Sequence, residues 1–212
     1  FDLDNTLYPA SCNLFNQVDK NMTRFIESFL NIDETAAHNL QKSYFKQYGT
    51  TLRGLMHNHA IQPMEFLEFV HDIDLTDIPP NPELSLNLEK LPGRKIIFTN
   101  GSVRHAENVT RHLGIYHHFQ DIFDIVASNF IPKPNHSIYE DLVNKLSIVP
   151  SSAVMIEDIA KNLEPAALMG MSTVWINNSA PWASEGSNQS HIHYIIDNLT
   201  LWLEEIVLHV NK

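Results

Sequence analysis

The stretch IIFTNGSVRHAENVTRHL, which runs from Ile96 to Leu113, contains three successive patterns. The apolar run Ile96–Phe98 follows a Pro-Gly pair and is typical of a short buried strand. The polar residues Thr99–Ser102 include a glycine and indicate a turn, and Val103–Leu113 then has a helical pattern. Strand, turn and helix in this order predict one unit of a parallel sheet that helices cover.

The rest of the C-terminal part repeats this plan, because short apolar runs alternate with helical stretches. The runs are Ile122–Ala127, Ala153–Ile156, Ser172–Ile176 and Tyr194–Ile196, and the helical stretches are Ser137–Leu146, Lys161–Met169 and Leu199–Val210. This alternation predicts an α/β fold: a Rossmann-like parallel sheet with helices on both faces and right-handed crossovers.

The N-terminal part differs, because residues 13–90 have an almost entirely helical pattern. Apolar residues recur at helical spacing from Leu14, and Asp33 is a suitable N-cap for a second helix that ends before Gly49. Further helical segments lie at Leu52–His59 and after Pro63, before a Pro-rich connector at Asp72–Pro82. We therefore expect an inserted all-helical cap domain over residues 13–82, and a core made of residues 1–12 and 83–212.

The chain opens with FDLDNTLYP, Phe1–Pro9, in which Asp2 and Asp4 stand two residues apart. Phe1 has the position of the last residue of a strand. We therefore expect a short, strongly apolar segment before it, so that Asp2 and Asp4 follow the first strand of the sheet.

Composition limits the classes of function. The net charge is −11, and no Lys/Arg cluster runs along any segment, which disfavours a nucleic-acid surface. The longest apolar runs are too short to cross a bilayer, so no membrane partner is expected. The single cysteine, Cys12, forms no internal disulfide, which favours a reduced, cytoplasmic protein.

Residues able to do chemistry follow each of the first strands. They are Asp2 and Asp4, then Thr99, Asn100 and Gly101, then Lys133 beyond a short loop, then Glu157 and Asp158. Parallel sheets bind ligands beyond the carboxyl ends of their strands, so these side chains are expected to meet at one edge.

This set of residues suits phosphoryl transfer. Converging carboxylates repel one another unless a cation lies between them, and oxygen ligands with few His or Cys nearby favour Mg²⁺. A carboxylate beside the metal can attack phosphorus. The Thr99 hydroxyl, the backbone N–H groups of Asn100 and Gly101, and the Lys133 ammonium can stabilise the charge on the transferred group.

The motifs DLDNT, FTNGS, the lysine of PKP, and ED followed by KN resemble the four motifs of the haloacid dehalogenase superfamily, in the order that this family uses. The resemblance extends over the whole chain, and the helical insert resembles the type 1 cap of the family. Stretches such as YGTTLRGLM and LPGRKIIFTNGS are similar to its pyrimidine 5′-nucleotidase branch.

The resemblance implies a role for each motif residue. It makes Asp2 the nucleophile and Asp4 the general acid and base, with Thr99, Asn100, Gly101 and Lys133 binding the phosphoryl group. The implied Mg²⁺ ligands are Asp2, Asp4 through its backbone carbonyl, Asp158 and, directly or through water, Glu157. The dehalogenases lack a second acid at the position of Asp4, so its presence favours phosphate esters over carbon–halogen bonds.

Within the cap, Tyr48 and Arg53 lie at the break between two predicted helices. One interpretation is that they bind the substrate, with Tyr48 stacking on a base and Arg53 meeting a base or ribose. The other is that they only connect helices.

The function that we expect is Mg²⁺-dependent hydrolysis of a small phosphorylated metabolite, in particular a pyrimidine nucleoside 5′-monophosphate, by a monomer or homodimer. The alternatives are a phosphatase or mutase acting on a sugar phosphate, a phosphonate hydrolase that needs a cap lysine such as Lys42 or Lys46, and a non-catalytic phosphate-binding relative.

Overall fold

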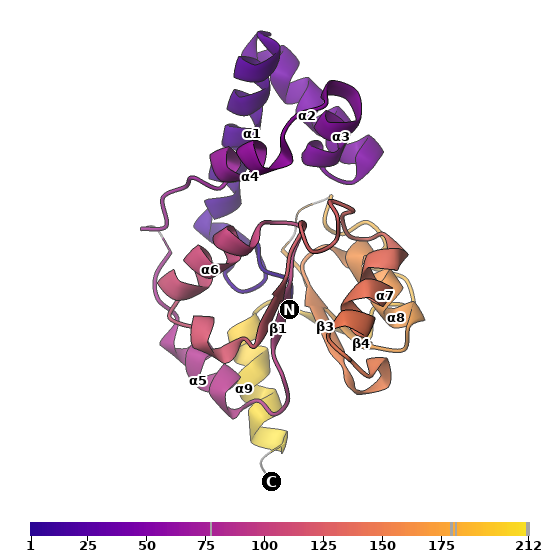
Figure 1. Ribbon diagram of the computed structural model, residues 1–212. Coiled ribbons are helices and arrows are strands. Elements are labelled where there is room, and N and C mark those ends of the chain that lie inside the picture. Colours follow the sequence, from indigo (N-terminus) through magenta and orange to yellow (C-terminus); the bar gives the residue numbers. More distant parts are fainter. Residues whose placement is uncertain (77, 179, 181, 211–212) are drawn as a thin grey trace.

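The computed structural model describes residues 1–76, 78–178, 180 and 182–210. Figure 1 shows an α/β core with a group of helices above it: α1 (Leu14–Leu30), α2 (Glu34–Tyr48), α3 (Thr51–His59) and α4 (Pro63–Val70). The first sheet pairs β1 (Ile96–Phe98) with β2 (Asp121–Phe123), and the second has the order β3 (Val154–Glu157), β4 (Ser172–Ile176), β5 (Tyr194–Ile196). All of these pairings are parallel, which confirms the predicted α/β class.

The main chain of Phe1 and Asp2 lies between the two sheets and joins them. The Asp2 amide donates to the carbonyl of Ile156 in β3 at 2.9 Å, and the Phe98 amide in β1 donates to the Phe1 carbonyl at 2.7 Å. In place of the single predicted sheet the structure has two short parallel sheets, and hydrogen bonds of Phe1 and Asp2 join them.

Helices flank both sides of these strands (Figure 1). On one side lie α5 (Pro82–Lys90), α6 (Val103–His112) and α9 (Leu199–Val210), and on the other lie α7 (His136–Lys145) and α8 (Glu164–Leu168). Short 3-10 turns lie at Ala10–Cys12, Tyr116–His118, Pro150–Ser152 and Ala160–Leu163. The predicted helix over residues 161–169 is thus a 3-10 turn followed by a short α-helix.

The predicted strand over residues 122–127 is wrong beyond Phe123. The carboxylate of Asp124 accepts hydrogen bonds from the Val103 amide at 2.9 Å and from the Ala127 amide at 2.8 Å. These bonds turn the chain away from the sheet and fix the first turn of α6 against the end of β2.

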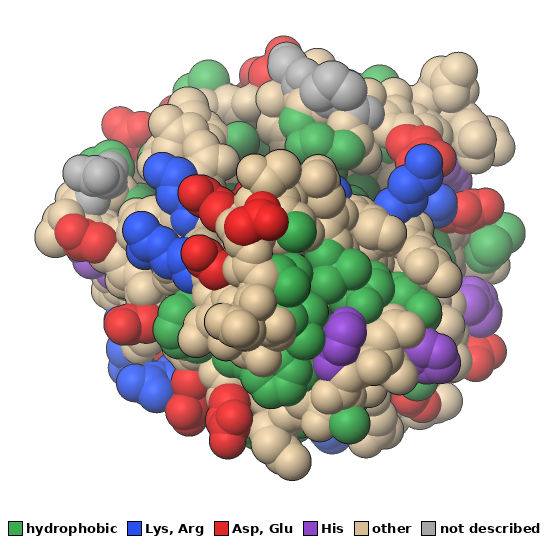
Figure 2. Space-filling view, turned by 90° about the horizontal axis from the view of Figure 1, so that it is seen from above, with side chains coloured by type: hydrophobic (Ala, Val, Ile, Leu, Met, Phe, Trp, Pro, Cys, Tyr) green, Lys and Arg blue, Asp and Glu red, His purple; other side chains and the backbone are tan. Residues whose placement is uncertain are grey.

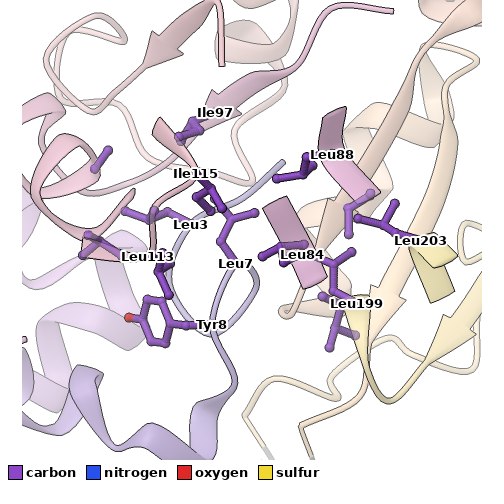
Figure 3. Close-up of a cluster of buried hydrophobic side chains, with 14 of the residues drawn as sticks. Leu3, Leu7, Tyr8, Leu84, Leu88, Ile97, Leu113, Ile115, Leu199 and Leu203 are labelled. Atoms are coloured by element: carbon purple, nitrogen blue, oxygen red, sulfur yellow. The ribbon is translucent and has the colours of Figure 1, made fainter. Parts of the chain in front are cut away.

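The loop that carries the first acidic residues is anchored in the core. Leu3 and Leu7 are buried and point into a cluster with Leu84 and Leu88 of α5 and with α9 (Figure 3). Burying side chains of this size stabilises the fold by roughly 1.5–3 kcal/mol each. Because Leu3 is fixed in the core, its neighbours Asp2 and Asp4 are directed away from it.

The helices above the core are α1 (Leu14–Leu30), α2 (Glu34–Tyr48), α3 (Thr51–His59) and α4 (Pro63–Val70). The side chain of Asp33 accepts from the Ala36 amide at 2.9 Å and caps α2, and Gly49 ends it with a φ of 85°. Both ends match the sequence prediction, because N-caps and C-terminal glycines act locally.

These helices pack closely on one another. A Cβ on Gly54 of α3 would lie 2.4 Å from Cβ and Cγ of Tyr44 in α2, so only glycine lets the two helices approach this far. Phe25 of α1 contacts Phe66 and Phe69 of α4, with centroid distances of 5.1 and 5.6 Å.

Seen from above, hydrophobic side chains gather in one area of the surface (Figure 2).

No helix in the part of the chain that the structure describes combines the length and the apolar character that crossing a membrane requires.

Candidate active site

The structure gathers the predicted motif residues around one cavity of about 430 Å³ between the core and the helices above it. Its floor is formed by Asp2, Asp4, Thr99, Asn100, Gly101, Lys133, Glu157 and Asp158. Thr99–Gly101 follow β1, and Glu157 and Asp158 lie at the carboxyl end of β3, where parallel sheets bind ligands. Asp2 is placed beside them by its main-chain hydrogen bond to β3.

Lys133 is the centre of a buried ionic group. Its ammonium donates to Oδ1 of Asp2 at 2.7 Å, to Oε1 of Glu157 at 2.8 Å and to the Phe98 carbonyl at 2.9 Å. The Lys133 side chain is 1% exposed, and the charges of the two carboxylates, against the effect of burial, raise its pKa. Lys133 is therefore a fixed positive charge beside Asp2.

Glu157 is held by three donors. Oε1 accepts from Lys133 and, at 2.6 Å, from Nδ2 of Asn162, while Oε2 accepts from the Ile159 amide at 2.7 Å. Asn162 therefore supports the site through Glu157. With both oxygens engaged by the protein, Glu157 is suited to orienting Lys133.

The cluster of Asp2, Glu157 and Asp158 is suited to binding a hard divalent cation. Oxygen atoms of Asp2, Glu157 and Asp158 lie within 4.8 Å of one another, and all three residues are buried. Burial and the charge of Glu157 raise the pKa of Asp2 to about 7, and the same causes raise that of Asp158 well above its ordinary value. One ammonium does not balance three carboxylates, so the ionised forms need further positive charge, which an oxygen-preferring metal ion supplies.

Asp4 lies beside this group in a different environment. Its Oδ1 accepts from the Tyr8 hydroxyl at 2.7 Å and from Nε2 of His105 at 2.7 Å. Burial alone would raise the pKa of Asp4, but the contacts with His105 and Tyr8 outweigh burial and hold it at about 2. Two carboxylates two residues apart thus have very different proton affinities, as acid–base pairs in active sites commonly do.

The turn after β1 brings donors to the same place. The Gly101 amide donates to Oγ1 of Thr99 at 2.9 Å. Oδ1 of Asn100 accepts from the Lys133 amide at 2.8 Å, so the Asn100 side chain connects the turn to the loop that carries Lys133. The side chain of Asn100 therefore faces Lys133, and its part in binding a phosphoryl group stays a prediction.

The upper wall of the cavity is mainly apolar. It includes Phe15, Val18, Met22, Phe45, Leu52, Phe66, Leu67 and Val70 from the helices above the core, together with Trp182 from the core. The rings of Phe45 and Trp182 pack edge to face, with their centroids 6.4 Å apart. A polar corner breaks the apolar wall, where Oδ1 of Asp19 accepts from Gln41 and from Lys42, both at 2.6 Å.

Of the two predicted cap contacts, neither Tyr48 nor Arg53 is among the described residues that line this cavity. The Tyr48 ring lies 5.3 Å from that of His57, and its hydroxyl accepts from Nδ2 of Asn58 at 3.2 Å. From the same break, Thr50, Thr51 and Leu52 line the cavity. A binding role for Tyr48 and Arg53 stays a prediction.

Sequence reasoning did not assign two residues of the site. His71, the residue after α4, lines the cavity, and its ring stacks on that of His105 at 4.3 Å with an angle of 11°. Trp182 also lines the cavity, and its side chain is half-exposed there. Neither His71 nor Trp182 lies in a motif that the sequence offers.

Comparisons with known proteins show the family of the chain. A family model described as haloacid dehalogenase-like hydrolase matches residues 1–170. Phosphate metabolism protein 8 of Saccharomyces cerevisiae is 31% identical over 195 residues, which cover 82% of this chain and 59% of that protein. Glyceraldehyde 3-phosphate phosphatase of Methanopyrus kandleri is 27% identical and covers 91% of this chain and 88% of its own length.

A solved structure extends the likeness to the fold. The crystal structure of a HAD phosphatase from Thermococcus onnurineus superposes with a TM-score of 0.62 at 19% identity, over 98% of this chain and 95% of that one. The two structures share an α/β fold. The chain spans 59% of the length of the yeast relative. The chain belongs to the haloacid dehalogenase-like hydrolase family.

Proposed function

We propose that the protein is a Mg²⁺-dependent phosphomonoesterase that forms an aspartyl-phosphate on Asp2, with pyrimidine nucleoside 5′-monophosphates as substrates. The observation that carries the proposal is the 2.7 Å contact between Lys133 and Asp2, inside a buried group of carboxylates at the floor of a cavity. The names of the two relatives, one a phosphatase and one a phosphate metabolism protein, support the same chemistry.

In the first step the Asp2 carboxylate attacks phosphorus. Lys133 holds Oδ1 of Asp2, which orients the carboxylate and leaves Oδ2 to form the new bond. The bond from phosphorus to the nucleoside oxygen breaks, its electron pair goes to that oxygen, and Asp4 gives it a proton. A Mg²⁺ ion would be held by Asp2, Asp158 and the backbone carbonyl of Asp4, and it would supply charge that offsets the repulsion between phosphate and carboxylates.

Asp4 must carry a proton when the ester bond breaks, although it is ionised in the free site. A phosphate dianion beside a carboxylate disfavours the charged form of that carboxylate, so substrate binding raises the proton affinity of Asp4. In the second step Asp4 takes a proton from water, and the water oxygen attacks phosphorus. Phosphate is released and the Asp2 carboxylate is restored.

The cavity favours a nucleoside as the leaving group. A volume of about 430 Å³ lies within the range of roughly 300–1,000 Å³ that drug-sized ligands occupy. The apolar wall with Phe45 and Trp182 suits the faces of a base, and the polar corner of Asp19, Gln41 and Lys42 suits its hydrogen-bonding edge. Opposite ends of the cavity would thus hold phosphate and base.

Hydrolysis of a small sugar phosphate is the second candidate, since one relative is named for a triose phosphate. That substrate would leave much of the apolar wall uncovered. A phosphonate hydrolase is less well supported, because its imine-forming lysine must be desolvated. Lys42 is ion-paired with Asp19 and its side chain is 50% exposed.

The test is a substrate panel of nucleoside monophosphates, sugar phosphates and p-nitrophenyl phosphate, run with Mg²⁺. We expect release of inorganic phosphate without a bisphosphate primer, which excludes a mutase, and the highest kcat/KM on a pyrimidine nucleotide. Asp2→Asn should abolish turnover, while Asp141→Asn, an exposed acid on α7, should leave it unchanged. Full activity of Asp2→Asn would refute the proposal, and a preference for a triose phosphate would replace the substrate.

The cytoplasmic location and the monomeric or homodimeric state stay predictions. Gel filtration at several protein concentrations would decide the second of these.

A further inference from the structure

The two oxygens of the Asp4 carboxylate face different surroundings. Oδ1 accepts two hydrogen bonds, from Nε2 of His105 and from the Tyr8 hydroxyl, each at 2.7 Å. Because a carboxylate only accepts, Nε2 of His105 must carry the hydrogen of this contact. Oδ1 is therefore directed toward α6 and the first loop, away from the cavity.

Oδ2 faces the turn after β1, Thr99–Ser102. A Cβ on Gly101 would lie 3.7 Å from Oδ2 of Asp4 and 3.3 Å from Oγ1 of Thr99, so both oxygens border the same small space. That space is where the turn after β1 meets the cavity floor. Rotation of the Asp4 side chain would exchange its two oxygens, and the contacts to Oδ1 oppose this rotation.

The His105 ring is itself fixed on two sides. Its side chain is 1% exposed, and a Cβ on Gly101 would approach Cδ2 of His105 to 3.2 Å, so glycine is what admits the ring here. On the other side, His71 stacks on it at 4.3 Å, and Nδ1 of His71 lies 3.1 Å from Oγ of Ser102. Ser102 is the N-cap of α6, the helix that carries His105.

From this geometry we infer that His105 is a positioning residue for Asp4, holding Oδ1 so that Oδ2 faces the oxygen of the leaving group. His71, at the end of α4, packs on the His105 ring and keeps it in place. Tyr8, His105 and His71 together form what we call the clamp on Oδ1 of Asp4. The inference rests on the proposed function, because it assigns Asp4 the proton transfer to that oxygen. The side-chain hydrogen bonds that the structure describes for Thr99, Asn100 and Lys133 join these residues to Gly101, to each other and to Asp2, Glu157 or Phe98, and none of them reaches the Asp4 carboxylate.

The test compares two leaving groups. The nitrophenolate of p-nitrophenyl phosphate departs with little need of a proton, whereas the ribose oxygen of uridine 5′-monophosphate needs one. For each substrate kcat/KM reports the steps up to release of the leaving group, so the ratio of the two values isolates the proton transfer.

For His105→Leu we expect kcat/KM on the nucleotide to fall about 100-fold, and the ratio of the nitrophenyl to the nucleotide value to rise at least about tenfold, since a positioned general acid contributes about 10²–10⁴-fold. His105→Gln, whose amide can donate in place of Nε2, should recover most of the loss. Equal losses on both substrates, or no loss, would overturn the inference.

The matched second variant is Tyr8→Phe, which removes the other donor to Oδ1 and nothing else. If His105→Leu does not fold, Tyr8→Phe and His105→Phe, each of which removes one donor to Oδ1 and keeps an aromatic ring, decide the matter by the same ratio. The ratio should rise in both, and an unchanged ratio in both contradicts the inference. Failure of the proposed function itself would be seen separately. In that case the wild-type protein releases no phosphate, or Asp2→Asn releases as much as the wild type.

Discussion

Nζ of Lys133 lies 2.7 Å from Oδ1 of Asp2, although 131 residues separate the two in the chain. Both side chains are buried, so this ion pair links the first loop to the segment after β2 in a medium of low polarity. Removing one partner of a buried pair leaves a charge without compensation, which costs far more than the pair itself contributes.

We therefore expect Lys133→Met to abolish activity and to lower the free energy of unfolding by about 3–5 kcal/mol, because Asp2 and Glu157 lose their shared cation. Urea denaturation in EDTA at neutral pH measures this loss. Adding Glu157→Gln removes one of the stranded charges, so the double variant should be more stable than Lys133→Met alone. Additive losses would show that the two residues are not coupled.

Mg²⁺ should raise the melting temperature of the wild-type protein. A ligand that binds only the folded state stabilises it by about 2.7 kcal/mol at one hundred times its Kd. Asp158→Asn, which removes one charge of the buried carboxylate group, should lose most of this shift in scanning calorimetry, and Asp141→Asn should keep it. An unchanged shift in Asp158→Asn would place the ion elsewhere.

His71 makes stability depend on pH. Burial, and then the neighbouring His105, lowers its pKa to about 3, although Asp4 acts in the opposite direction. The unfolded chain, with a His71 pKa of about 6.5, therefore binds more protons than the folded one between these values. This part of the stability is complete above pH 6.5 and is lost as the pH falls toward 3.

From these pKa values, the wild-type protein should lose about 2 kcal/mol more than His71→Phe between pH 7 and pH 5. Phenylalanine keeps an aromatic face against His105 and cannot titrate, so the difference between the two proteins isolates His71. Urea unfolding at the two pH values measures it. If the two proteins lost the same free energy of unfolding between pH 7 and pH 5, the lowered pKa of His71 would be contradicted.

Gly54→Ala should destabilise the helices above the core. Alanine favours a helix over glycine by about 1 kcal/mol, but its Cβ would meet Tyr44 at 2.4 Å, and overpacking costs about 1–3 kcal/mol. We expect the clash to dominate and the melting temperature to fall. Ser43→Ala, on the exposed face of α2, is the control and should change little.

Sequence reasoning reached those parts of the molecule that depend on local rules. Asp33 and Gly49 bound α2 as expected, because capping acts within one helical turn. Thr99 and Asp158 follow strands of parallel sheets and reach the same edge of the core, and this topology could be predicted from the alternation of strands and helices.

Other features depend on tertiary contacts that leave no mark in the sequence. The turn at Asp124 depends on an amide of α6 that lies far along the chain, so the end of β2 could not be placed. The stack of His71 on His105 depends on where α4 ends above the core. The side chain of Tyr48 turns toward His57, which only the packing of α2 on α3 decides.

Phe1 and Asp2 join the two sheets, which carry different parts of the site. The strand β1 leads to Thr99 and Asn100, and β3 leads to Glu157 and Asp158, with Asp2 bonded to β3 and Phe1 to β1. A rotation of one sheet against the other would move the turn after β1 away from Glu157 and Asp158, and Asp2, which lies between the sheets, would be nearest to the axis of that rotation. In the proposed mechanism Asp2 takes part in both chemical steps, and such a rotation would displace it least.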